Sequence, residues 1–403
     1  MPLSQRYSSL FDSPVIVWYN GWEEHGNPSG PVDSLPPLEG NDSLRAAMQQ
    51  LSQVGHIPHM AVWGNHWILK RRGAGYDGSE RFEREGAPLA ALDQHGQIPK
   101  SGTAEYTFAT LCNGSEKAQE LFVNYFGQIM DLGAIALELD HQAWPSECYS
   151  DQHRHAPGYG PWMGQQTTSF LRKVRESTKR RNAAGAFSFE GALEPWLQDV
   201  DFMLYRPYMP GLIPLFTYIY HEYITLMGGD GPYGITHPEE QLIQHATNFV
   251  YGNTMFVMVG LNDFDFEVKP DYPIFTLLRN ICQAQRTYAR EYVVFGRMLK
   301  PTKLDMSTIM AAPWYTWEEP DPPLTVQVPK VMHSVWESRG KIGYVLANWS
   351  AQTEHVKLGL VKNNGRVSSV SATGRSAVPE EQVTTGEIDL AVPARGIVVV
   401  EQA

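Results

Sequence analysis

Short apolar runs of strand length alternate with amphipathic segments of helix length along residues 14–261. Strand-like runs occur at 14–22, 56–67, 133–144, 183–191, 201–207, 214–223 and 253–261, and helical patterns at 41–55, 115–133, 163–180 and 238–250. Apolar strands separated by helices are typical of a parallel sheet that is buried on both faces. The pattern therefore predicts an α/β fold, a (β/α)8 TIM-type barrel.

Seven strands are clear in this pattern, whereas a closed barrel of this type has eight. The eighth strand is either irregular, within the stretch EYVVFGRML at 291–299, or missing, so the predicted barrel is complete or lacks one strand. Residues 68–114 have weak periodicity and are interpreted as a long insertion. Long loops on a rigid scaffold often shape a binding site.

From about residue 300 the pattern changes to short alternating runs between Gly, Pro and Asn residues, such as KIGYVLANWS at 341–350 and RGIVVVEQA at 395–403. This change is typical of an antiparallel β-sandwich. Two domains are therefore predicted, a catalytic barrel at 1–300 and a C-terminal sandwich at 301–403. Trp349, the tryptophan in ANWS, is expected to pack in the sandwich and not to bind sugar.

Charge and hydropathy exclude several classes of partner. The net charge is −12, which argues against nucleic acid, because binding to the phosphate backbone relies on clustered Lys and Arg. The one dense basic run, RKVRESTKRR at 172–181, fits the solvent face of a helix. No apolar run has the roughly 18 residues of a membrane helix, and no signal peptide is recognised. We expect a soluble protein, either cytoplasmic or exported with its signal removed.

The cysteines and histidines give no strong metal signal. Cys112, Cys148 and Cys282 are too far apart for a CxxC pair, a zinc-ligand spacing or a disulfide framework. Asp151, His153 and His155 form a D-x-H-x-H array, but a single array without a second cluster is weak evidence. The favoured interpretation is that these histidines contact a sugar or solvent, and neither a metal nor a cofactor is predicted.

Acidic and aromatic residues follow the predicted strands, at the edge where functional groups of such barrels gather. Carboxylates and aromatic faces suit sugars, which stack on rings and donate hydrogen bonds to acids. The candidate substrate-binding residues are Trp22, His66, Trp67, His141, His155, Arg206, His221 and Glu222.

The sharpest feature is the pair Asp140 and Glu190, each one step past an apolar run on neighbouring strands. Glycosidic hydrolysis needs two carboxylates beside the anomeric carbon, and strands about 5 Å apart can supply them. Glu138 has the same orientation one layer deeper. A role as a buried hydrogen-bonding partner explains it at least as well as a direct role in catalysis. The competing interpretation of Asp140 is a simple cap of the following turn.

Four motifs carry a resemblance to a known family: NGWEEHGNPSGPVDSLPP, LDHQAWPSECYSDQHRHAPGYGPWMGQ, FSFEGALEPWLQDVD and PLFTYIYHEYITLMGG. With them, residues 14–300 resemble a glycoside-hydrolase-like family of unknown function, DUF6259-like, which implies a (β/α)8 barrel with a terminal β-sandwich. The order of acids is also similar to that of the α-amylase clan. This similarity implies retention at an α-linked sugar, with Asp140 as nucleophile and Glu190 as proton donor. Glu194 is the alternative acid if a helical turn follows the strand.

The leading hypothesis is a glycoside hydrolase that acts on an oligo- or polysaccharide without a required metal. One alternative is a non-catalytic carbohydrate-binding protein on a degenerate barrel. Another is a metal-dependent hydrolase that uses Asp151, His153 and His155. The sequence predicts neither the sugar and its linkage nor the oligomeric state.

Overall fold

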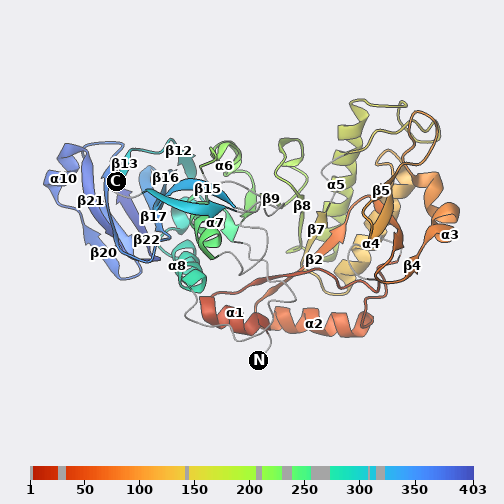
Figure 1. Ribbon diagram of the computed structural model, residues 1–403, viewed down its shortest axis with the longest axis horizontal. Coiled ribbons are helices and arrows are strands. Elements are labelled where there is room, and N and C mark those ends of the chain that lie inside the picture. Colours follow the sequence, from red (N-terminus) through yellow and green to blue (C-terminus); the bar gives the residue numbers. More distant parts are fainter. Residues whose placement is uncertain are drawn as a thin grey trace. The chain divides into compact units, whose positions relative to one another are not determined.

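The computed structural model describes residues 3–25, 33–140, 145–205, 211–228, 238–255, 273–306, 309–314 and 323–403. Contacts within the chain divide it into two compact units (Figure 1), residues 14–204 and residues 1–13 with 205–403. The predicted domain boundary near residue 300 is placed at the change in hydrophobic pattern. It stays a prediction. No helix among these described ranges is long and apolar enough to cross a bilayer.

Seven strands follow one another in the order β1-β2-β7-β8-β9-β10-β11. Their bounds are β1 Ile16–Tyr19, β2 Ile57–Trp63, β7 Ala136–Asp140, β8 Ala186–Glu190, β9 Phe202–Tyr205, β10 Thr225–Gly228 and β11 Thr254–Met255. Each pair whose register is defined is parallel. Six of the seven predicted ranges contain one of these strands, and the exception is β10.

Two sequence-based assignments are wrong. Residues 214–223 do not form a strand; they contain helix α6 (Leu215–Tyr220), and the strand is β10, a few residues later. An unbroken apolar run has no period that separates a strand from a buried helix. The stretch 291–299 is not an eighth parallel strand either. It contains α9 (Arg290–Val293) and β12 (Arg297–Leu299), and β12 pairs antiparallel with β16 (Val331–Ser338).

In the unit formed by residues 14–204, helices α2 (Asn41–Gln53), α4 (Glu116–Asp131) and α5 (Trp162–Arg181) connect the parallel strands. These three helices match the predicted segments. The hydroxyl of Ser115 caps α4 by accepting from the Ala118 amide at 3.4 Å. Helix α4 lies beside α5 (Figure 1), and α5 contacts β8. The basic run at 172–181 forms the second half of α5, as predicted.

The insertion at 68–114 is a folded element of the same unit. Strands β3 (His66–Arg71), β4 (Tyr76–Asp77), β5 (Lys100–Gly102) and β6 (Tyr106–Thr110) form an antiparallel sheet in the order β4-β3-β6-β5. Short helical turns follow β4: α3 (Ser79–Arg81), η1 (Phe82–Gly86) and η2 (Ala87–Leu89). The register of β3 on β6 shifts between Ile68 and Lys70. Such an irregularity breaks the period of two, which explains the weak pattern in the sequence.

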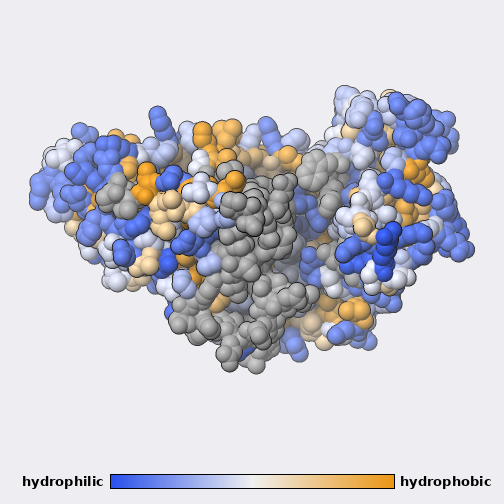
Figure 2. All heavy atoms as spheres, in the orientation of Figure 1, coloured by the Kyte–Doolittle hydropathy of each residue, from blue (hydrophilic) through white to orange (hydrophobic). Residues whose placement is uncertain are grey.

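The other unit contains the C-terminal antiparallel sheets. A six-stranded sheet has the order β12-β16-β17-β22-β19-β20, a three-stranded sheet β13-β18-β21, and a two-stranded sheet β14-β15. The remaining bounds are β13 Leu304–Met306, β14 Ile309–Trp314, β15 Leu324–Pro329, β17 Lys341–Asn348, β18 Glu354–Gly359, β19 Val367–Ser371, β20 Gly374–Ala377, β21 Glu387–Val392 and β22 Ile397–Gln402. Hydrophilic side chains cover much of the visible face around α10 (Glu380–Thr385) in Figure 2.

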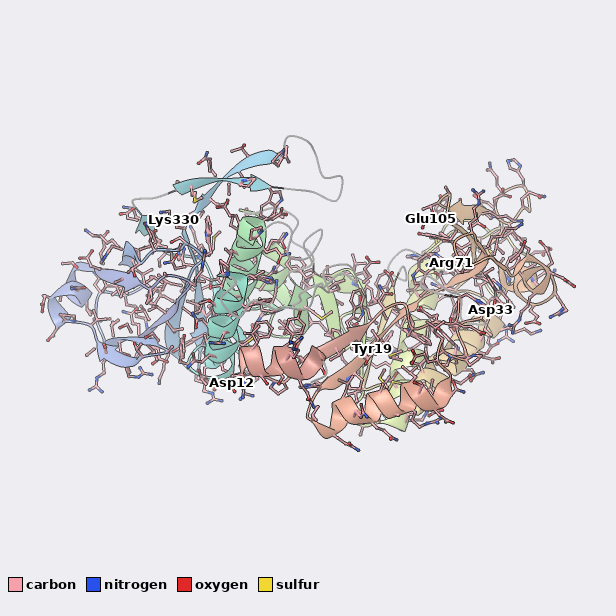
Figure 3. The ribbon with its side chains drawn as sticks, turned by 60° about the horizontal axis from the view of Figure 1, so that its bottom comes forward. Asp12, Tyr19, Asp33, Arg71, Glu105 and Lys330 are labelled. Carbon is pink, nitrogen blue, oxygen red and sulfur yellow. The ribbon has the colours of Figure 1, made fainter. Side chains whose placement is uncertain are left out.

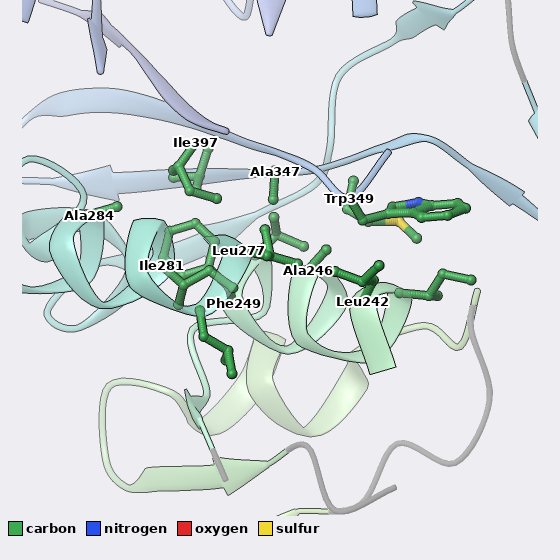
Figure 4. Close-up of a cluster of buried hydrophobic side chains, with 14 of the residues drawn as sticks. Leu242, Ala246, Phe249, Leu277, Ile281, Ala284, Ala347, Trp349 and Ile397 are labelled. Atoms are coloured by element: carbon green, nitrogen blue, oxygen red, sulfur yellow. The ribbon is translucent and has the colours of Figure 1, made fainter. Parts of the chain in front are cut away.

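Two apolar clusters hold this unit together. Helices α1 (Leu3–Phe11), α7 (Pro238–Val250) and α8 (Pro273–Arg286) share one cluster with strands of the C-terminal sheets. Figure 4 shows part of it, with Phe249 and Ile281 on the helices and Trp349 and Ile397 on the sheet side. Trp349 is buried and donates to Pro329 O at 2.7 Å, in agreement with the predicted packing role. A second cluster is shared by the six-stranded and three-stranded sheets.

Candidate functional site

The register of β2, β7 and β8 places most of the polar side chains of these strands on one face of the sheet. Trp63 of β2 pairs with Asp140 of β7, and one layer deeper Ala61 pairs with Glu138. Glu138 in turn pairs with Ser188 of β8. Because side chains alternate along a strand, these residues share a face, and their neighbours Leu139 and the phenylalanines of β8 point the other way into the core.

Asp140 and Glu190 end neighbouring strands at the same level. Leu139 pairs with Phe189, so the next residue of each strand is one of the two acids. Both side chains are partly buried. Neighbouring strands lie about 4.8 Å apart, close to the separation of about 5 Å between the two carboxyl groups of retaining glycosidases.

Glu194 has a different environment. It begins the 3-10 turn η3 (Glu194–Trp196) and is exposed. Gly191 directly after β8 has φ 97°, a conformation that favours glycine and ends the strand. Residues 191–193 form no helical turn, so the premise that would place Glu194 on the same helical face as Glu190 is wrong.

Glu138 lies in the interior beside a histidine. It is 1% exposed, and its Oε2 is 3.6 Å from Nε2 of His59, which is fully buried. Burial lowers the pKa of His59 to about 3, so the imidazole is neutral near pH 7. The ring of Phe202 packs edge-on against His59 at 5.4 Å between centroids. This environment agrees with the interpretation of Glu138 as a buried partner one layer below Asp140.

Three of the predicted sugar-binding residues are buried in the same unit. The indole of Trp22 donates to Ala61 O at 3.0 Å. His66 is 8% exposed and stacks on Phe108 at 4.1 Å. Trp67 is 1% exposed and packs edge-on against a phenylalanine of the insertion, which leaves it little surface for a ligand.

The other predicted sugar-binding residues are dispersed. In the unit with the C-terminal sheets, His221 is buried, with its ring nitrogens 3.0 Å from Gly296 O and 3.0 Å from Val293 O, and burial lowers its pKa. Glu222 beside it is exposed. His155 lies in a cluster with cysteines, described below. His141 and Arg206 lie outside the described residues.

Sequence reasoning did not select Glu23, in the loop after β1, as a candidate site residue. Its side chain is 1% exposed, and Oε2 has no hydrogen-bond partner among the described residues. Burial raises the pKa of Glu23 from 4.5 to about 7, although backbone amides and the charge of Arg71 (labelled in Figure 3) act in the opposite direction. Only its position in the motif NGWEEHG, directly after Trp22, could have pointed to it.

Sequence reasoning also missed a thiol–imidazole cluster, which consists of Cys112, Cys148, His153 and His155. One possible ligand atom from each residue lies within 4.8 Å of all the others. The interaction between the two neighbouring thiols lowers the pKa of Cys148 and raises the pKa of Cys112. The spacing of these cysteines in the sequence gives no zinc-ligand pattern, but the fold brings two of them together with two histidines.

Comparisons with known proteins identify the class of fold and then the family. The debranching enzyme of Nostoc punctiforme matches with a TM-score of 0.60 at 11% identity, over 98% of this chain and 87% of that one. The α-amylase of Geobacillus thermoleovorans, complexed with acarbose, matches with a TM-score of 0.60 at 11% identity, over 99% and 90%. A cycloisomaltooligosaccharide glucanotransferase of Paenibacillus sp. matches with a TM-score of 0.60 at 8% identity, over 99% and 82%. At these identities the similarity shows the fold alone.

The family follows from the sequence model. The model described as "Domain of unknown function (DUF6259)" matches residues 1–232, which is more than half of the chain. The chain therefore belongs to the DUF6259 family, as the resemblance implied. A comparison with curated proteins gave no match.

Proposed function

We propose that this protein is a retaining glycoside hydrolase that acts on an α-linked oligo- or polysaccharide. The observation that carries the proposal is the register of β7 and β8, which ends two adjacent parallel strands on Asp140 and Glu190. The fold, shared with a debranching enzyme and an α-amylase, supports a carbohydrate substrate.

In the proposed mechanism Asp140 attacks the anomeric carbon while Glu190 protonates the leaving oxygen. The bond from carbon to the leaving oxygen breaks as the bond to the Asp140 carboxylate forms. Glu190, now ionised, then removes a proton from water, which attacks the same carbon and releases Asp140. Glu138, one layer below, carries no step.

The experiment is a panel of aryl α- and β-glycosides and natural polysaccharides, with wild type beside Asp140→Asn and Glu190→Gln. We expect Glu190→Gln to reduce kcat/KM by about 10²–10⁴-fold on a substrate whose leaving group needs a proton. The reduction should be much smaller with a dinitrophenyl leaving group, which departs without one. Asp140→Asn should lose activity on both, because no covalent intermediate can form.

Matched controls are Asp131→Asn and Glu176→Gln, since both residues are exposed and pair with arginines of α5. They should keep wild-type activity. Activity of Asp140→Asn equal to wild type, in a folded protein, would refute the assignment. If wild type cleaves nothing but binds a polysaccharide, and Asp140→Asn binds it equally well, the carbohydrate-binding alternative is favoured.

The metal-dependent alternative receives less support from the array that suggested it. Asp151 is exposed and accepts a hydrogen bond from Gln152 at 2.9 Å. The two histidines of that array instead cluster with two cysteines, and the cluster does not include Asp151. Four protein donors around one ion leave no open position for an attacking water.

A further inference from the structure

The thiol–imidazole cluster is assembled from two segments that are remote in the sequence. Cys112 follows strand β6 of the insertion, and Cys148, His153 and His155 lie in the loop after β7. Both cysteines are buried and both histidines are partly buried. The cluster lies wholly within the unit 14–204, so its geometry does not depend on the other unit.

Two of the distances between donor atoms are close to those of a tetrahedral site. Cys112 Sγ is 3.2 Å from His155 Nε2, and Cys148 Sγ is 3.4 Å from His153 Nδ1. Bond lengths of about 2.3 Å to sulfur and about 2.0 Å to nitrogen put such donors roughly 3.5 Å apart around a tetrahedral zinc ion. These two sulfur–nitrogen pairs already have the spacing of donors around one ion, and all four donor atoms lie within 4.8 Å of one another.

Each imidazole is oriented by its other nitrogen. His155 Nδ1 lies 2.9 Å from Ala156 O, and His153 Nε2 lies 3.2 Å from Pro88 O. A carbonyl oxygen can only accept, so each of these nitrogens carries the proton and the nitrogen that faces sulfur carries the lone pair. Metal-binding histidines are held in this way by backbone carbonyls.

Backbone amides also lie close to both sulfur atoms. The Gly114 amide lies 3.3 Å from Cys112 Sγ, and the amides of Leu92 and Ser150 each lie 3.5 Å from Cys148 Sγ. Amide donors stabilise a thiolate, which is the form that binds a metal. Three backbone donors on two buried sulfurs exceed what two neutral thiols require.

The apolar packing around the cluster is small. The buried group there consists of Ala91, Cys112, Cys148 and Trp162, with Met163 packed against it. The His155 ring stacks on Trp162 at 3.6 Å between centroids. So few side chains give little hydrophobic stabilisation to the loop segments they join, and a bound ion is a common means of stabilising so small a core.

We propose that Cys112, Cys148, His153 and His155 bind one Zn²⁺ in a closed, structural site. Two thiolates and two imidazoles in a tetrahedral arrangement suit zinc, and four protein ligands leave no position for substrate. The ion joins the insertion to the loop that follows Asp140. This site is independent of the proposed glycosidase chemistry, and its test does not measure activity.

The test is metal analysis of the full chain, purified without chelator from zinc-containing medium. We expect one zinc per chain. The double variant Cys112→Ser/Cys148→Ser should contain none, and His153→Gln should bind zinc at least about 100-fold more weakly in a chelator competition. Two matched controls keep the four ligands: Cys282→Ser, which removes the remaining thiol, and Asp151→Asn, which tests the D-x-H-x-H array. Both should keep one zinc per chain.

A second measurement does not depend on the variants being folded. Wild type stripped with chelator and reloaded with Co²⁺ should show the strong visible bands of a tetrahedral ion and a thiolate-to-cobalt charge-transfer band. Stoichiometric zinc in the double-cysteine variant would overturn the proposal. Wild-type protein that contains no metal, and whose mass after alkylation shows a Cys112–Cys148 disulfide, would also overturn the proposal. Wild-type protein that contains iron or copper in place of zinc would overturn it as well.

Discussion

Glu23 provides a quantitative test of the burial in the unit formed by residues 14–204. The pKa of its carboxyl is raised from 4.5 to about 7 because the side chain is desolvated. At about 1.4 kcal/mol per pKa unit, this difference corresponds to about 3 kcal/mol. The folded state binds the proton more tightly than the unfolded chain does. This contribution to stability is therefore fully present below pH 4.5 and is lost as the pH rises through about 7.

Glu23→Gln removes the titration and keeps the shape of the protonated side chain. We expect the variant to match wild type near pH 4.5 and to be more stable by about 3 kcal/mol at pH 8. The assay is urea unfolding of both proteins between pH 4.5 and 8.5, followed by tryptophan fluorescence. The difference between the two free energies of unfolding cancels the titration of histidines such as His59, whose depressed pKa gives the opposite slope.

Glu176→Gln is the control for Glu23→Gln, because Glu176 is an exposed acid of α5 whose pairing with Arg180 spans 3.9 Å. Its difference from wild type should stay within a few tenths of a kcal/mol across the same pH range, roughly the size of a surface pair. A difference for Glu23→Gln that does not change with pH, or a variant less stable than wild type at pH 8, would refute the reasoning. Glu23 would then be ionised in the folded state and stabilised by Arg71.

Three further substitutions test local packing and hydrogen bonding. A Cβ on Gly114 would lie 2.2 Å from Cδ2 of His155, so Gly114→Ala should weaken zinc binding by about 10–100-fold in a chelator competition. Gly164→Ala on α5, where a Cβ meets nothing within 4 Å, should keep the zinc affinity and raise the free energy of unfolding by about 0.5–1 kcal/mol. Tyr344→Phe removes a buried hydroxyl that lies 2.8 Å from Gln402 Oε1. It should lower the free energy of unfolding by about 1–3 kcal/mol in urea, and an unchanged midpoint would contradict the importance of this bond.

The parallel strands were predictable because their information is local. Strands β2, β7 and β8 are short apolar runs that each follow a helix of clear period, and all three lie inside the predicted ranges. The adjacency of Asp140 and Glu190 follows from the same pattern, since consecutive strands in such folds are usually neighbours. The pattern failed at α6 because an apolar run around Pro214 gives no periodic signal, and it failed at 291–299 because β12 pairs with strands of the C-terminal sheet.

The thiol–imidazole cluster shows why the candidate metal ligands could not be found in the same way. Three of its members are local, in the pattern C-x4-H-x-H from Cys148 to His155, but the fourth, Cys112, comes from the insertion, whose register the sequence pattern did not reveal. Zinc sites recognised from sequence have ligands in close pairs, and here one cysteine stands alone. The loop with the three local ligands begins directly after Asp140, so an ion bound there would restrain the chain eight residues beyond the proposed nucleophile. A structural metal at this position would therefore restrain this segment without taking part in the chemistry.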